Sequence, residues 1–184
     1  MYDLEFLKLH LEACWGKSSS QQLRIPDPYN KMPLEFRVVK FPPSETHNFW
    51  IYSTLGMSID MTEDLIELHT FSAEQNDHAL VELLTVTASF HRNDTPLGLH
   101  HSVNIGRPWQ DNSLCDHAFI SLPYLDGNEL EIFSFGENHL HNLWLLPITE
   151  QERGYKMLHG PDALEEKFEE CELNYLDVNS KSCV

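Results

Sequence analysis

Short apolar runs, each closed by turn-forming residues, limit the fold of this chain more than any other feature. The runs are rich in aromatic and branched side chains and are bounded by Pro, Gly, Asp or Asn, a pattern typical of β-strands. The predicted strands are Leu34–Phe41, Phe49–Leu55, Leu65–Phe71, Val103–Ile105, Ala118–Pro123, Leu130–Phe135 and Leu143–Pro147. The middle of the chain is therefore expected to be rich in strands.

Helical patterns precede and interrupt these strands. Leucines recur on one helical face over Asp3–Trp15, and Gly16 follows where a C-terminal cap would lie, so a helix is predicted there. A second helix is predicted over Ala79–Phe90, although its branched residues also suit a strand. The polar stretch Ser18–Gln22 and the prolines that follow it predict a loop.

Two more helices are predicted near the C-terminus. Thr149 and Glu152 have the spacing of a capping box, and Pro161 after Gly160 is typical of a helix start. Helices near both termini around a strand-rich middle predict an α+β fold, with a mixed, largely antiparallel twisted sheet. The length fits a single domain over residues 1–184.

The charge of the chain argues against several classes of partner. Its 184 residues include 12 Lys and Arg against 29 Asp and Glu, a formal net charge of −17. Phosphate backbones and anionic membranes repel such a chain, so neither nucleic-acid binding nor membrane association is expected. No apolar run reaches the roughly 18 residues of a membrane span. The acidic start Met1–Glu5 is unlike a signal peptide.

The four cysteines are widely scattered and form no Cys-x-x-Cys pair. They are Cys14, Cys115, Cys171 and Cys183. Such spacing favours reduced thiols over a disulfide framework, and with them a cytoplasmic location. A domain of this size also buries enough surface to be stable without a metal or a disulfide.

The histidines suggest a metal site only weakly. The densest groups are His100-His101, Cys115-Asp116-His117 and His139-x-His141. None has the knuckle or helical spacing of paired zinc ligands, so no metal or other cofactor is predicted. The alternative is a metal-dependent hydrolase that uses His100, His101, Asp116 and His117. A thiol nucleophile at Cys115 beside His117 would also need an oxyanion hole, for which the sequence offers no signature.

Gly106-Arg107-Pro108-Trp109 places a planar cation and a large aromatic at a turn. The structural interpretation pairs Arg107 with a carboxylate such as Asp116 and buries Trp109 in the core. The functional interpretation makes this turn part of a surface that holds a partner. The two interpretations are compatible.

Several linked motifs resemble the suppressor of fused family, and its bacterial single-domain branch in particular. They are Val103–Trp109, Cys115–Tyr124 and Leu143–Glu152, joined by Phe49–Met57, Ile66–Phe71, Gly160–Phe168 and Leu176-Asp177. The resemblance covers most of the chain after about Thr46. It implies a non-enzymatic domain of mixed helix and sheet.

The family also implies a kind of partner. Its animal member clamps a short extended peptide of a transcription factor in hedgehog signalling, using a second domain for which this chain is too short. Bacterial single-domain relatives are regarded as immunity proteins that silence a toxin. The resemblance therefore implies a cytoplasmic immunity protein that binds a cognate toxin. A bacterial scaffold without a toxin partner is the alternative within the same class.

The family's peptide-binding region includes an Asp-His pair after a Gly, and the nearest match here is Gly98-Leu99-His100-His101. His100 thus replaces the acidic member. Because a sheet edge offers unpaired backbone groups to an extended segment, we expect a binding edge there. The residues expected near it are His100, His101, Asn104, Arg107 and Trp109, with Arg107 bracing the edge. A second candidate surface is the acidic run Glu165, Glu166, Glu169 and Glu170.

Overall fold

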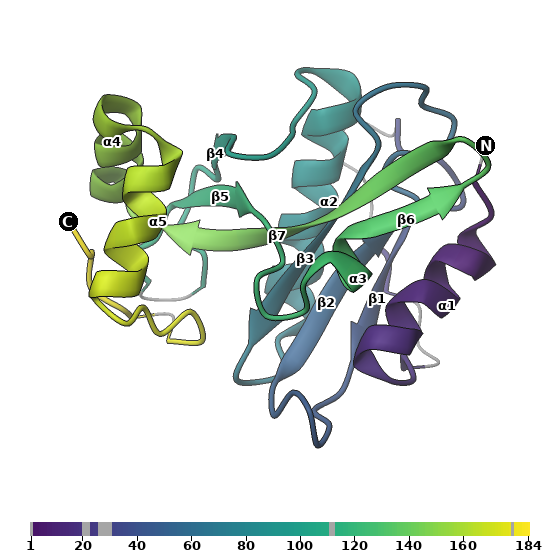
Figure 1. Cartoon of the computed structure of the whole chain (residues 1–184), viewed down its shortest axis with the longest axis horizontal. Coiled ribbons are helices and arrows are strands. Elements are labelled where there is room, and N and C mark those ends of the chain that lie inside the picture. The colour runs from purple at the N-terminus through teal and green to yellow at the C-terminus, as the bar shows by residue number, and fades with distance from the viewer. Residues whose placement is uncertain (1, 20–22, 26–30, 111–112, 178) are drawn as a thin grey trace. The chain divides into compact units, whose positions relative to one another are not determined.

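The computed structural model describes residues 2–19, 23–25, 31–110, 113–177 and 179–184. Its strands form one mixed sheet in the order β1-β2-β3-β7-β5-β4, with β6 paired to β7 (Figure 1). Four pairings, β1 with β2, β2 with β3, β4 with β5 and β6 with β7, are antiparallel, whereas β3 and β7 run parallel. This arrangement confirms the predicted α+β fold with a mixed sheet.

The described chain divides into two compact units, and the boundary falls within β7 (Asn138–Ile148). The first unit comprises Met1–Leu99 and Leu122–Trp144, and the second His100–Ser121 and Leu145–Val184. The prediction of one domain over residues 1–184 remains a prediction.

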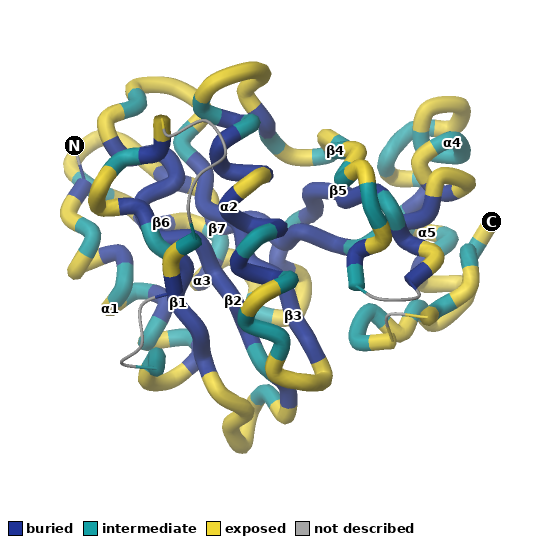
Figure 2. Tube along the Cα trace, turned by 180° about the vertical axis from the view of Figure 1, so that it is seen from behind, coloured by how far each residue is buried: buried dark blue, intermediate teal, exposed yellow. Residues whose placement is uncertain are grey.

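In the first unit, β1 (Arg37–Phe41), β2 (Trp50–Leu55) and β3 (Ile66–Ser72) are buried along almost their whole length (Figure 2). Burial of successive residues, whose side chains alternate between faces, means that both faces are covered. Helices α1 (Leu4–Trp15) and α2 (Asp77–Asn93) both pack on β2. The α2 range confirms the helical alternative over the strand.

Two local predictions for this unit need adjustment. The predicted strand Leu130–Phe135 is wrong at its start, where a short helix α3 (Asn128–Glu131) precedes β6 (Ile132–Phe135). Gly127, with φ at 70°, turns the chain into that helix, and strand propensity alone does not register such a turn. Of the predicted loop Ser18–Gln22, residues 20–22 lie outside the described residues.

The second unit contains β4 (Ser102–Asn104), β5 (His117–Ser121), the end of β7, α4 (Glu150–His159) and α5 (Pro161–Glu170). The capping box is present: the Thr149 hydroxyl accepts from the Glu152 amide, and the Glu152 carboxylate accepts from the Thr149 amide at 2.7 Å. Both predicted C-terminal helices are therefore confirmed.

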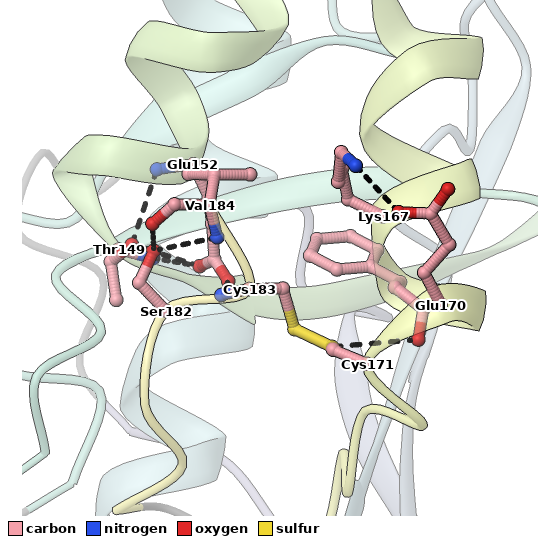
Figure 3. Close-up of a disulfide and its surroundings, with 9 residues drawn as sticks. Thr149, Glu152, Lys167, Glu170, Cys171, Ser182, Cys183 and Val184 are labelled. Atoms are coloured by element: carbon pink, nitrogen blue, oxygen red, sulfur yellow. Dashed lines mark hydrogen bonds and ion pairs between the residues drawn. A yellow bond between two sulfur atoms is a disulfide. The ribbon is translucent and has the colours of Figure 1, made fainter.

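A disulfide joins Cys171 to Cys183 in this unit (Figure 3). The expectation of reduced thiols is thus wrong for this pair, whereas Cys14 and Cys115 are free. The C-terminal tail folds back toward α4, where the Cys183 amide donates to Glu152 Oε1 at 3.0 Å. This return brings Cys183 to Cys171. Sequence spacing does not reveal such a return of the chain.

Candidate functional site

A groove of about 440 Å³ in the first unit combines charged and apolar walls. His139, His141 and Leu143 alternate along β7 and therefore share one strand face. Leu99 lines the same groove, beside Gly98 of the predicted binding motif. The volume falls in the range of about 300–1,000 Å³ typical of ligand sites.

The polar groups of this groove are mostly acids and imidazoles. His141 Nδ1 lies 3.1 Å from Glu131 Oε1, and His139 Nδ1 lies 2.9 Å from the Ser134 hydroxyl. Glu63 and Asp64 add two more carboxylates to the lining. The groove therefore suits an apolar group that carries a positive charge.

The edge strand β4 is the main feature of the second unit. It ends the strand order and pairs, among described strands, with β5 alone. The Ile105 amide donates to Asp116 at 3.0 Å, so the alternation of an antiparallel ladder directs the backbone groups of Ser102 and Asn104 away from β5. Asn104 is exposed. This edge can accept an added strand.

A β-bulge precedes β4 at His100. The His100 amide donates to the Ile120 carbonyl at 2.7 Å, and the Ile120 amide donates to the His101 carbonyl at 2.9 Å. His100 and His101 thus both lie opposite Ile120, and His100 has φ at 67°. This conformation is the one that glycine usually supplies in this kind of bulge. The bulge aims the His100 side chain independently of the strand.

The His100 side chain lies against β5 and α5. Its ring stacks on Phe119 with centroids 6.1 Å apart and an interplanar angle of 7°. The backbone carbonyl of His100 accepts from Lys156 Nζ at 2.7 Å, and that ammonium lies 5.4 Å from the centre of the Phe119 ring. Burial, with a smaller contribution from Arg153, lowers the pKa of Lys156.

The remaining predicted residues lie at the end of β4 and in the turn that follows it. Asn104 Oδ1 accepts from the Gly106 amide at 2.7 Å, and the Arg107 guanidinium donates to the Pro108 carbonyl at 3.1 Å. Trp109 is 1% exposed, and its amide donates to the Cys115 carbonyl at 2.7 Å. Trp109 therefore packs in the core, while His101 and Asn104 are exposed.

Within the described residues, the four ligands expected for a metal-dependent hydrolase, His100, His101, Asp116 and His117, do not form a cluster. Among the described residues, the one group of three donors within 4.8 Å of one another is His100, Asp162 and Glu165. His117 instead lies against Asp116, with Nδ1 and Oδ1 2.7 Å apart. Burial raises the pKa of the Cys115 thiol to about 11, which opposes a thiolate nucleophile.

Sequence reasoning missed the groove and the approach of α5 to His100. The groove joins residues from five separate segments, and no local spacing signals that convergence. The Asp162 and Glu165 pair was visible as an i, i+3 repeat on one helix face. Its histidine neighbour is 62 residues away along the chain, since 162 − 100 = 62.

Comparisons with known proteins agree on one family. The family model for Suppressor of fused protein (SUFU) matches residues 33–179. A SUFU homolog from Neisseria gonorrhoeae FA 1090 is 31% identical, with a TM-score of 0.82 and coverage of 98% of this chain and 96% of that one. No curated protein sequence matched closely enough to count as a relative.

Two more distant structures share the fold. The Sufu–Fu complex has 11% identity, a TM-score of 0.71 and coverage of 98% of this chain and 91% of that one. Drosophila Suppressor of Fused has 10% identity, a TM-score of 0.70 and coverage of 96% of this chain but 50% of that one. No helix in the described ranges is long and apolar enough to cross a membrane.

Proposed function

This chain belongs to the suppressor of fused family, and we propose that it is a non-enzymatic protein-binding module that receives an extended segment of its partner on the edge of β4. The observation that carries the proposal is the outward-facing backbone of Ser102 and Asn104 on the terminal strand. Backbone hydrogen bonds from an added strand supply affinity, while neighbouring side chains supply specificity. The Sufu–Fu complex is a protein complex of the same fold.

The partner we propose is a basic toxin, neutralised in the cytoplasm by this chain as its immunity protein. The net charge of −17 favours a positively charged partner, because complementary fields raise association rates. On α5, Glu166, Glu169 and Glu170 are exposed, although Glu170 pairs with Lys167. The carboxylates of the groove in the first unit add a second acidic surface.

The first experiment is co-expression with the toxin encoded beside this gene. Rescue of growth and recovery of a complex are the expected results. A toxin that kills equally with and without this chain, and that does not co-purify with it, would remove the immunity function.

A backbone test then locates the binding edge. Asn104→Ala removes a side chain that accepts from the Gly106 amide, whereas Asn104→Pro also removes the outward-facing amide without deleting a bond to β5. Asn104→Ala and His101→Ala should each weaken the complex, and Asn104→Pro should abolish it, all with unchanged circular dichroism spectra. Exposed Lys181 provides the control as Lys181→Ala. Equal affinity of Asn104→Pro and the parent protein would rule out the β4 edge.

A further inference from the structure

We propose that His100, Asp162 and Glu165 form a binding site for a divalent transition-metal ion of the Zn²⁺ class. One imidazole nitrogen and two carboxylate oxygens from these residues lie within 4.8 Å of one another. A tetrahedral ion with ligands at about 2 Å needs its donors roughly 3.4 Å apart. Small side-chain rotations therefore close the site, which lies wholly within the second unit.

The backbone places each of these donors for a local reason. Asp162 and Glu165 are three residues apart on α5, so both carboxylates project from the same helix face. His100 reaches them from the bulge, where its φ of 67° turns the side chain away from the regular strand direction. The sequence positions a histidine where the backbone conformation favours glycine.

Neighbouring side chains hold two of the three donors in place. Ser121 Oγ donates to Glu165 Oε1 at 2.5 Å, and the Phe119 ring fixes the plane of the His100 imidazole. Among the residues that the structure describes, none hydrogen-bonds to the His100 ring nitrogens or to the Asp162 carboxylate. An outer partner that orients a ligand is a common feature of metal sites.

Charge and donor type select the ion. Asp162 and Glu165 place two carboxylates at the site, beside the Lys156 ammonium that bonds the His100 carbonyl, and paired carboxylates favour a divalent cation. An imidazole ligand suits zinc, cobalt, nickel or copper, whereas magnesium and calcium prefer oxygen donors alone. The site is half-buried at His100 and Glu165 and exposed at Asp162, so water can complete the coordination.

The test uses the untagged full-length chain with its disulfide intact. Titration calorimetry with ZnCl₂, and visible absorption with CoCl₂, should report one ion per chain in the parent protein. His100→Gly, Asp162→Asn and Glu165→Gln should each weaken zinc binding by at least about tenfold, and Ser121→Ala by about tenfold through the lost orientation of Glu165. His100→Gly suits the bulge backbone, so loss of binding will not reflect misfolding.

Matched controls separate this site from adventitious binding. His101→Ala removes the neighbouring exposed imidazole, and Glu166→Gln removes the neighbouring exposed carboxylate on α5. Both should bind zinc as the parent does, and zinc should raise the melting temperature of the parent but not of His100→Gly. Absence of zinc binding, or unchanged affinity in His100→Gly and Asp162→Asn, would overturn the proposal. The outcome is independent of whether a toxin partner is found.

Discussion

His69 should make this protein increasingly unstable as the pH falls below about 6.5. The side chain is 0% exposed, and neither ring nitrogen has a hydrogen-bond partner among the described residues. It packs against Trp15 and Phe71, with ring centroids 5.1 and 5.3 Å away. Burial lowers the pKa of His69 to about 3, because no neighbour stabilises the imidazolium.

The sign and size of the effect follow from proton linkage. Below pH 6.5, His69 binds a proton in the unfolded chain but not in the folded protein. The free energy of unfolding therefore falls as the pH falls. Each pH unit between the unfolded and folded pKa removes about 1.4 kcal/mol. At pH 5 the loss is therefore about 2 kcal/mol, a large part of a typical stability of about 5–15 kcal/mol.

Urea unfolding of the parent protein and His69→Leu, followed by tryptophan fluorescence, isolates this residue. Leucine has a similar volume and cannot be protonated, and all other titrating groups are shared by the two proteins. Between pH 7.5 and pH 5, His69→Leu should gain about 2 kcal/mol relative to the parent. His69→Gln provides a second uncharged variant, and exposed His139→Leu is the control. A difference that stays constant with pH in both His69 variants would refute the reasoning.

Three further predictions concern the second unit and are checked by thermal and urea unfolding. Cys183→Ser should lower the free energy of unfolding by about 3 kcal/mol, because the disulfide closes a short loop, and dithiothreitol should destabilise the parent but not this variant. Thr149→Ala should cost about 1 kcal/mol by removing the capping hydroxyl, whereas Thr149→Ser should retain most of it. Trp109→Ala should cost about 3–5 kcal/mol because the ring is buried. The exposed variant His101→Ala should stay within about 0.5 kcal/mol of the parent.

The sequence predicted secondary structure correctly where the stabilising interactions join residues close together in the chain. The Thr149 and Glu152 pair predicts a helix start because both capping bonds join residues three apart. The apolar spacing of Ala79–Phe90 favours a helix despite its branched residues, and α2 covers β1, β2 and β3. In each case the interaction that stabilises the element lies within the sequence window that predicts it.

Contacts between segments far apart in the chain could not be predicted from the sequence in this way. Cys171 and Cys183 look like scattered thiols until the tail returns to Glu152. His139 and His141 share one face of β7, but Glu131, which lies beside His141, comes from the short helix that the strand pattern concealed. The groove was therefore hidden by one wrong local assignment as well as by distance.

His100 links the family resemblance to the chemistry of this particular chain. The resemblance matches His100 to an acidic member of the family motif, and a carboxylate at this position would add a third negative charge beside Asp162 and Glu165. An imidazole avoids that repulsion and offers a nitrogen ligand beside the two carboxylates. His100 also holds its side chain at φ 67°, which costs about 1 kcal/mol or more relative to glycine. In the proposed metal site, the imidazole of His100 therefore supplies a nitrogen ligand at a position where a carboxylate would repel its two neighbours.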